Sequence, residues 1–358
     1  MPHVPRTKYS VLYWGAMTTK LEARGELLTA LRLSRGLTQV ELAAEIGISQ
    51  AALSKVESGE ARLDVRAWRK VAEALMVPLS AFRDVQSAAA PARIFHRKQR
   101  TTPKSAVNKV AAELSLVRLR VRDLLGDRAT TLRRHDLEGG FNTPQEVARL
   151  VRDELGLGRE PVADLVAILE DAGVLVLRWS LDTIQVDAIA SWQEGGVPVI
   201  LIGEHVPADR QRFTMAHELG HAVMHEDAAE KEQESEADAF AAEFLAPSSE
   251  IDKEWPSGSD LDALLILKRR WGISLAALIR RGRDIGRLTE QEYRQWNIHL
   301  SATGMHRREP DPTERENPTA LSTAIRRFLD EGASIEGLAS SAHMYPREFR
   351  LTFLQETS

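Results

Sequence analysis

The sequence predicts a multidomain protein in which an all-α domain precedes an α+β domain that ends in a helical subdomain. Three observations support this fold class. The chain has 358 residues, more than a single domain usually contains. Short helical patterns separated by glycine fill residues 20–82, whereas strand patterns occur only beyond residue 141. A helix that carries two histidines follows those strands.

The composition indicates a soluble globular protein of a reducing compartment. Hydrophobic residues make up 43% of the chain and charged residues 28%, which is enough to form buried cores. The chain has no cysteine, so disulfides, thiolate zinc sites and cysteine-ligated iron–sulfur clusters are excluded. No apolar run approaches the roughly 20 residues of a membrane span. We therefore expect a cytoplasmic protein without a membrane partner.

Residues 38–59 have the pattern of a helix-turn-helix. Thr38 can cap one helix, with Glu41 three positions later completing a capping box, and that helix runs to Gly47. Ser49 then caps a second helix that ends before Gly59. Two helices joined by a short glycine-containing turn are typical of DNA-binding proteins.

The run Leu37-Thr-Gln-x-x-Leu-Ala-x-x-Ile-Gly-Ile-Ser-Gln-x-x-Leu-Ser-Lys-Val-Glu-x-Gly59 resembles the phage-repressor-like (XRE-type) helix-turn-helix family. The resemblance implies DNA as a partner, with base edges in the major groove facing the second helix and phosphates fixing the register. The domain is only slightly basic, so a small helical bundle that binds protein stays open as the alternative. The implied base contacts are Gln50, Ala51 and Lys55, and the implied phosphate contacts are Gln39 and Ser54.

Residues 88–140 are strongly basic. Apolar residues recur at helical spacing from Ser105 to Leu125, which predicts an amphipathic helix. One interpretation is a solvated connector helix. The other is an arm that adds phosphate contacts beside the helix-turn-helix.

From residue 141 the pattern is mixed helix and strand. Thr143 caps a helix with Pro144 at its first position, and a second helix covers residues 164–171. Strands are predicted at residues 174–179, 188–192 and 197–202. A helix that begins near Asp209, with this residue as its cap, follows the last strand. Helices on a small sheet followed by a histidine helix form the core layout of many zinc peptidases.

That helix contains His217-Glu-Leu-Gly-His221, the H-E-x-x-H pattern of zinc hydrolases. Positions four apart lie on one helix face, so His217 and His221 can bind one metal ion. Glu218 lies beside them and can take a proton from water. An ordinary amphipathic helix is the alternative, because the pattern arises by chance in roughly a few per cent of chains of this composition.

A third ligand is expected from the acidic helix that ends before Pro247. Glu234 and Asp238 share one face of it, which fits a metal ligand and a carboxylate that holds the other ring nitrogen of a ligating histidine. Of the two remaining acids, Glu236 is expected to point elsewhere and Glu243 to be solvated.

Residues 141–310 resemble the ImmA/IrrE family of metallopeptidases. The matching segments are Asp209–His221, Glu234–Pro247 and Leu267–Ile279. The family commonly has methionine where this chain has Ala246, which we interpret as a packing variation. The resemblance implies a zincin-like fold of the gluzincin type. It also implies a protein substrate, typically a helix-turn-helix repressor whose cleavage relieves repression.

The same resemblance implies a zinc site of His217, His221 and Glu234, with Glu218 as the general base. Mn²⁺ or Fe²⁺ could occupy the same set of nitrogen and oxygen ligands. An additional donor to a developing oxyanion could be supplied by a further side chain. The sequence does not choose among its three candidates, Tyr293, His205 and His225.

The C-terminal helices carry no assigned chemistry. Arg280, Arg281 and Arg283 could bind substrate or nucleic acid, although a structural subdomain is the favoured interpretation. Short helices are predicted at residues 320–330 and 335–342. The predicted segments are a disordered tail (1–16), the helix-turn-helix domain (17–87), a basic linker and helix (88–140), the peptidase domain (141–257), its helical subdomain (258–310), and a linker with a small helical tail (311–358).

The sequence thus favours a DNA-associated zinc metallopeptidase that controls transcription by cleaving a repressor, in stress, mobile-element or toxin–antitoxin control. A transcriptional regulator whose peptidase-like domain senses a metal or ligand without proteolysis is the alternative. Cleavage of the chain's own linker, near residues 88–104, is a third option. The substrate, the operator and the activating signal stay open, and a homodimer is one of the open arrangements.

Overall fold

The structure is a computed structural model that describes residues 24–82, 103–126, 130–135, 137, 143–181, 187–192, 197–225, 231–258, 260–306 and 308–354. The predicted tail at residues 1–16 and most of the linker, residues 88–102, lie outside the described residues. The chain divides into two compact units. Unit 1 comprises Met1–Ala92, Thr101–Arg128 and Leu321–Ser358, and unit 2 comprises Arg93–Arg100 and Ala129–Ala320. The predicted series of six consecutive segments stays a prediction.

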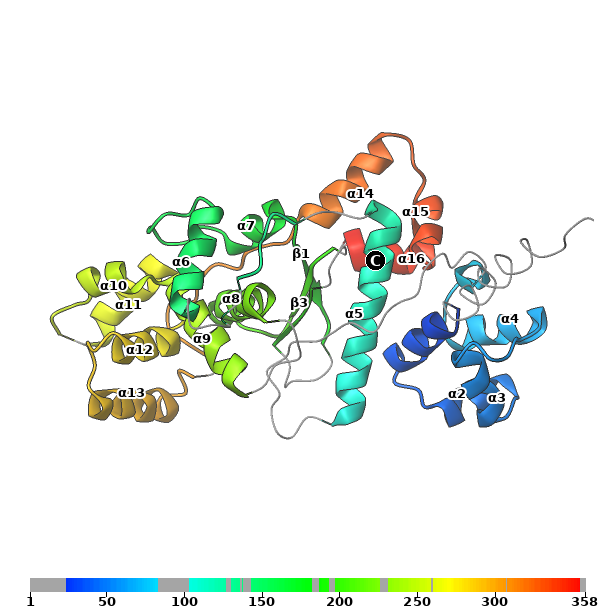
Figure 1. The fold of residues 1–358 in the computed structure, drawn as a ribbon, viewed down its shortest axis with the longest axis horizontal. Helices are drawn as coiled ribbons and strands as arrows, with labels where there is room; N and C mark the ends of the chain where they lie inside the picture. The colour runs from blue at the N-terminus through cyan, green and yellow to red at the C-terminus, as the bar shows by residue number, and fades with distance from the viewer. Residues whose placement is uncertain are drawn as a thin grey trace, which may run out of the picture. The chain divides into compact units, whose positions relative to one another are not determined.

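The N-terminal part of unit 1 contains the predicted helix-turn-helix (Figure 1). A helix at residues 24–34 precedes α2 (Gln39–Ile46) and α3 (Gln50–Glu57). The predicted capping box is present, because the Thr38 hydroxyl accepts a hydrogen bond from Glu41 N at 3.2 Å and the Glu41 carboxylate accepts one from Thr38 N at 2.7 Å. The helices α4 (Val65–Ala74) and η1 (Leu79–Phe82) complete the bundle around buried leucines and valines.

The helix predicted at residues 105–125 is α5 (Lys104–Leu125). Ten of its residues are buried, and Leu116 and Leu119 belong to the same hydrophobic core as the helix-turn-helix. The interpretation of a solvated connector is therefore wrong, because the apolar face of α5 is covered along most of its length. Its predicted role as an arm on phosphates stays a prediction.

The C-terminal helices belong to unit 1. They are α14 (Ala320–Asp330), α15 (Ile335–Ser341), α16 (Pro346–Phe349) and η2 (Arg350–Leu354), so the two predicted short helices are confirmed. Tyr345 donates a hydrogen bond to the carbonyl of Val77 at 3.2 Å, and His343 Nε2 lies 3.1 Å from the Asp123 carboxylate. Segments from both ends of the sequence therefore build this unit.

Unit 2 contains a three-stranded sheet with the order β1-β3-β2 (Figure 1). The predicted strands are β1 (Leu175–Trp179), β2 (Ala188–Ser191) and β3 (Val199–Gly203). The central β3 runs parallel to β1 and antiparallel to β2, and all five of its residues are buried. Continuous apolar runs are typical of such a central strand.

The helices of unit 2 are, in chain order, α6 (Pro144–Glu154), α7 (Leu165–Asp171), α8 (Ala208–Met224), α9 (Lys231–Leu245), α10 (Ser248–Glu254), α11 (Leu261–Trp271), α12 (Leu275–Asp284) and α13 (Glu290–Ala302). They pack on the sheet through α7 and α8, and α8 carries the histidines of the motif. The histidine helix α8 packs against α9, β2 and β3. Gly220 permits the close approach of α9, because a Cβ atom there would lie 2.9 Å from the ring of Phe240.

The expected capping role of Asp209 is wrong. The helix α8 begins one residue earlier, after Pro207, and has no side-chain cap. Asp209 is instead buried, where it accepts hydrogen bonds from Lys268 Nζ at 2.8 Å and from Thr313 N at 2.9 Å. A buried lysine needs a compensating charge, and this requirement outweighs capping.

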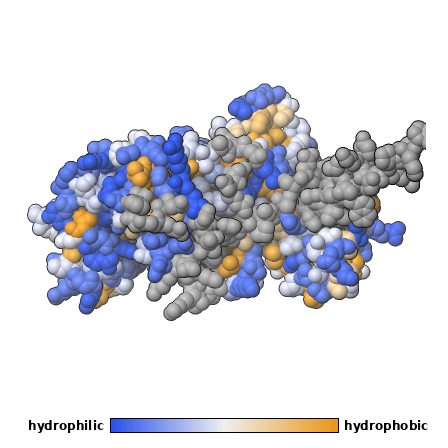
Figure 2. All heavy atoms as spheres, in the orientation of Figure 1, coloured by the Kyte–Doolittle hydropathy of each residue, from blue (hydrophilic) through white to orange (hydrophobic). Residues whose placement is uncertain are grey.

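The face of the molecule drawn in Figure 2 is mainly polar. In the view of Figure 2, hydrophilic residues cover most of the surface that is not grey, and hydrophobic residues occur in small groups. Among the described residues, no helix combines the length and apolar character that crossing a membrane requires.

Candidate metal centre

Helices α8 and α9 bring the three predicted ligands together. His217 and His221 lie one turn apart on α8, and their Nε2 atoms are 3.1 Å apart. Glu234, on α9, has one carboxylate oxygen 3.3 Å from His221 Nε2 and the other 3.6 Å from His217 Nε2. One ligand atom from each residue lies within 4.8 Å of the others. Both histidines are buried, whereas Glu234 is partly exposed.

This arrangement fits a tetrahedral metal ion. Zinc binds nitrogen and oxygen ligands at about 2.05 Å, which places two tetrahedral ligand atoms about 3.3 Å apart. The separation of 3.1 Å between the two nitrogens, and those of 3.3 and 3.6 Å from the nitrogens to the two different oxygens of Glu234, lie around this value. Two imidazole nitrogens that face each other can share at most one proton, so a cation between them is also electrostatically favourable.

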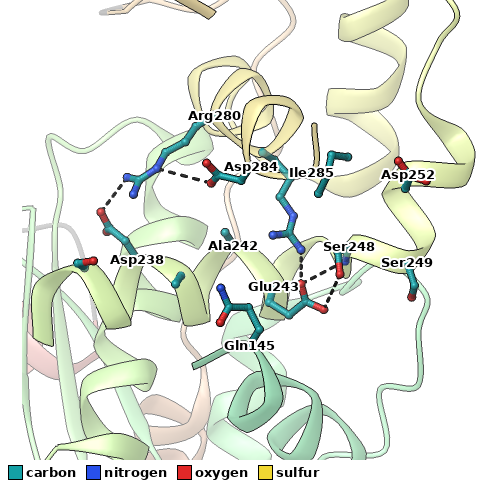
Figure 3. A pocket seen from close by; sticks show the side chains of 13 residues that line it. Gln145, Asp238, Ala242, Glu243, Ser248, Ser249, Asp252, Arg280, Asp284 and Ile285 are labelled. Atoms are coloured by element: carbon teal, nitrogen blue, oxygen red, sulfur yellow. Dashed lines mark hydrogen bonds and ion pairs between the residues drawn. The ribbon is translucent and has the colours of Figure 1, made fainter. Parts of the chain in front are cut away.

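The other ring nitrogen of His217 is held by a carboxylate, as the sequence predicts. Its Nδ1 atom lies 2.9 Å from Asp238 Oδ1, and Arg280 donates to the other oxygen of Asp238 at 2.8 Å (Figure 3). Burial alone would lower the pKa of His217, but the hydrogen bonds with Asp238 and Glu234 raise it to about 9. Asp238 therefore fixes the ring and makes the Nε2 atom of His217 more basic.

A second series of side-chain contacts, which the sequence did not predict, lies behind His221. Its Nδ1 atom is 2.9 Å from Nδ1 of His225, and Nε2 of His225 is 2.9 Å from the Glu236 carboxylate. Glu236 lies outside the ligand triad, as expected, but it holds His225 in place. The spacing of four residues between His221 and His225 is the signal that could have revealed this contact.

Glu218 has the environment of a proton acceptor with a raised pKa. It is 2% exposed, and its Oε2 atom forms no hydrogen bond with any described residue. Burial raises the pKa of Glu218 to about 8, and the charge of Glu234 acts in the same direction. For Glu234, burial is outweighed by hydrogen bonds with His217 and His221, which lower its pKa to about 2. The two carboxylates thus differ in their affinity for a proton.

The expectation that Glu243 is solvated is wrong. This carboxylate is buried and pairs with the buried guanidinium of Arg281, and it also accepts from Arg149 at 3.0 Å and from Ser248 N at 3.2 Å (Figure 3). Arg283 lies over the ring of Tyr293, 4.4 Å from its centre. These contacts favour the structural interpretation of the arginines of α12.

The three candidates for the oxyanion donor have different surroundings. The Nδ1 atom of His225 already contacts Nδ1 of His221. His205 is exposed in the turn after β3, and Tyr293 packs beneath Arg283. The role of each in catalysis stays a prediction.

The segment that contains this site matches the model of a known family. Residues 169–282 match the IrrE N-terminal-like domain, Peptidase_M78. The matched IrrE-like segment contains His217, Glu218, His221 and Glu234. Residues 28–82 match a helix-turn-helix family, so the two domains follow in the predicted order. No curated protein matches the chain. The chain therefore carries a segment similar to helix-turn-helix domains, followed by a segment similar to the IrrE N-terminal-like domain.

The helix-turn-helix presents the expected residues on α3. Gln50, Ala51 and Lys55 are exposed, and Ser54 is partly exposed. Gln39 is half-buried, accepts a hydrogen bond from Gln50 at 2.7 Å, and donates one to the Glu57 carboxylate at 2.8 Å. Two of the residues expected to contact DNA therefore contact each other. Glu57, whose role the sequence did not indicate, links Gln39 to the buried Arg32.

Proposed function

We propose that this protein is a DNA-associated zinc metallopeptidase that regulates transcription by cleaving a partner helix-turn-helix repressor. The observation that carries the proposal is the convergence of His217, His221 and Glu234 beside the buried Glu218. Three ligands leave one tetrahedral position for a reactant, as in catalytic zinc sites. A zincin-like fold and a location in the cytoplasm belong to the same proposal.

The residues of the site have distinct roles in peptide hydrolysis. A bound zinc ion would polarise the scissile carbonyl and lower the pKa of water at the site. Glu218 takes the proton of the attacking water and returns it to the leaving amine, for which a pKa of about 8 is suitable. Asp238 and His225 orient the rings of His217 and His221. The low pKa of Glu234 keeps this carboxylate available as a ligand.

The N-terminal helix-turn-helix supplies the association with DNA. Gln50 suits an adenine edge, Ala51 a thymine methyl group, and Lys55 an acceptor in the major groove. Gln39 and Ser54 contact phosphates and fix the register. An enzyme held at an operator in this way acts where its repressor substrate is bound.

The substitution Glu218→Gln tests the enzymatic part. The amide keeps the size of the side chain but cannot accept the proton, so we expect zinc binding to persist and repressor cleavage to fall at least 100-fold. Purified wild-type and variant proteins would be compared by metal analysis and by cleavage of helix-turn-helix repressors captured from cells. Equal cleavage by both proteins would exclude the proposed base. A fragment cut near residues 88–104 in the wild type alone would instead identify self-cleavage.

A sensor without proteolysis is a second candidate, and one observation favours it. A cavity of about 610 Å³ between α9, α10 and α12 is lined by Asp238 and Arg280, the pair that holds His217 (Figure 3). A molecule bound in this cavity would contact Asp238 and Arg280, which hold the proposed metal ligand His217. This candidate gains support if DNA binding responds to metal while no captured repressor is cleaved.

A further inference from the structure

The C-terminal helices repeat the backbone of the N-terminal helix-turn-helix residue by residue. Residues 320–349 follow residues 24–53 with a constant offset of 296 positions, from Thr38 to Ser334. Helices cover residues 24–34 in the first segment and Ala320–Asp330 in the second. The segments share only four identical residues: Leu33 and Leu329, Gly36 and Gly332, Leu42 and Leu338, and Ala43 and Ala339.

The two segments end their first helix and begin their second in the same way. Gly36 and Gly332 both have positive φ, at 73° and 98°. The residue after each glycine donates a backbone hydrogen bond to the carbonyl five positions earlier. Thr38 and Ser334 then cap the next helix, accepting from the backbone nitrogen three positions later at 3.2 and 3.1 Å.

The turn between the second and third helices is also the same. Gly47 and His343 both have positive φ, at 78° and 56°. Ile48 N donates to the carbonyl of Ala43 at 3.0 Å, and Met344 N donates to that of Ala339 at 2.9 Å. The N-cap residues have nearly identical torsion angles, −75° and 151° at Ser49 and −73° and 147° at Tyr345.

Burial follows the same register on either side of this turn, although not in the first helix, where the buried Leu27 and Leu31 correspond to the exposed Thr323 and Arg327. Ala43 and Ala339 are buried before the turn, and Leu53 and Phe349 are fully buried after it. In the first motif Val56 closes the core, whereas Phe353 does so in the second, one position later. The π-helical segment η2 accounts for this shift, because it inserts one residue into the turn.

The positions that face DNA in a helix-turn-helix are exposed in the repeat. Arg347 and Arg350 correspond to Ala51 and Ser54, and Leu351 corresponds to Lys55. All three are exposed, and neither arginine forms an ion pair with any described residue. Arginine is suited to phosphates and to the edge of guanine. Arg347 on α16 and Arg350 at the start of η2 therefore present two positive charges that no acidic side chain of the described residues pairs with.

The corner between α11 and α12 shows that turn geometry alone is not sufficient. Gly272 has positive φ, as do Gly47 and His343, and Ser274 caps α12 as Ser49 caps α3. However, Leu275 and Ile279, at the positions of Gln50 and Ser54, are fully buried. That corner can only serve packing, whereas the repeat leaves its second helix accessible.

We propose that residues 320–354 form a second DNA-reading helix-turn-helix, with duplex DNA as its ligand and Arg347 and Arg350 as its contacts. Both motifs belong to unit 1, where Arg35 and Glu348 lie 3.5 Å apart and join them. The protein therefore reads a bipartite site, one part through α3 and the other through α16. The inference extends the DNA binding of the proposed function and is independent of proteolysis.

Selection from a pool of duplexes tests this inference. The full chain would be mixed with duplexes carrying a random core of about 30 base pairs, roughly three helical turns. Bound DNA would be sequenced for the wild type, Arg347→Ala/Arg350→Ala and Gln50→Ala/Lys55→Ala. The matched control is Arg326→Ala/Arg327→Ala, which removes two exposed arginines from α14. The conservative Arg347→Lys/Arg350→Lys variant keeps the charge, and thermal unfolding verifies that each variant is folded.

We expect the wild type to select two separate stretches of preferred bases. Arg347→Ala/Arg350→Ala should lose one stretch, bind the selected site about 10-fold more weakly, and reduce the salt dependence of binding by about 2 in logarithmic slope. The lysine variant should restore the slope, and the α14 control should match the wild type. A single stretch that depends only on Gln50 and Lys55 would overturn the inference. If Arg347→Ala/Arg350→Ala weakens DNA binding and Gln50→Ala/Lys55→Ala does not, the inference stands and the proposed role of α3 fails. The absence of binding to any duplex would overturn both, whereas repressor cleavage is measured separately.

Discussion

At Gly220 helix α8 lies close against Phe240 of α9, and Gly220→Ala tests that contact. A Cβ atom at this position would lie 2.9, 3.1 and 3.2 Å from Cδ1, Cγ and Cβ of Phe240. Ordinary carbon–carbon contacts are about 3.5–4.0 Å, so the overlap is about 0.6 Å for the closest pair. Phe240 is itself fully buried and stacks against Phe244, so its ring has little room to move.

Two opposing effects decide the size of the change. Alanine favours a helix interior over glycine by about 1 kcal/mol. Overpacking in a dense core costs about 1–3 kcal/mol. Because the contact involves the base of a buried ring and not the end of a flexible chain, we expect overpacking to outweigh the gain in helix propensity, with a net loss of up to about 2 kcal/mol in the free energy of unfolding. The displacement of α9 from α8 should also weaken zinc binding through Glu234.

The assay is urea unfolding of the metal-free protein, together with zinc titration against a competing chelator. Gly220→Ala/Phe240→Leu is the matched control, because the smaller side chain removes the overlap. In a double-mutant cycle, the double variant should be at least 1 kcal/mol more stable than the sum of the two single substitutions predicts. A Gly220→Ala protein about 1 kcal/mol more stable than the wild type, without coupling to Phe240→Leu, would refute the reasoning.

Three further predictions concern the supports of the site. Asp238→Asn should lower zinc affinity about 10- to 100-fold, because the amide holds His217 without charge; chelator competition measures this, and unchanged affinity would rule out that role for Asp238. Glu243→Ala should destabilise unit 2 by about 3–5 kcal/mol, because it leaves the buried Arg281 unpaired; urea unfolding checks it, with the exposed Glu290→Ala on α13 as a control that should change little. Removal of zinc by chelation should lower the unfolding temperature of unit 2. Zinc at about 100 times its Kd should add back about 2.7 kcal/mol to the free energy of unfolding. An unfolding midpoint that is independent of zinc would contradict the proposed site.

Local features were the ones that the sequence could predict. The capping box at Thr38 and the cap at Thr143 depend on residues three positions apart, and the structure contains both. The proximity of Glu234 and Asp238 to the histidines followed from helical spacing combined with the chemistry of the donors. In each case the interacting groups lie on one element or on two elements whose pairing the motif already implied.

The errors came from partners that are distant in sequence. Asp209 pairs with Lys268, 59 positions away, and Glu243 pairs with Arg281, 38 positions away. Helical spacing alone cannot show that an acidic residue will meet a buried cation. The repeat of the helix-turn-helix was missed for a related reason, since its backbone is specified by caps and left-handed turns that different residues supply, such as Gly47 and His343.

The contacts of Lys268 bear on how short a functional peptidase fragment can be. Its ammonium group binds Asp209 on α8 and also the carbonyl of Asp311, at 2.6 Å. Glu316 pairs with Arg212 on the same helix and accepts from Val166 N at 3.1 Å. A fragment cut at residue 282, where the family match ends, would strip these partners from buried cations beside the histidine helix. The smallest fragment of the IrrE-like domain that can be expected to fold must therefore extend through Glu316.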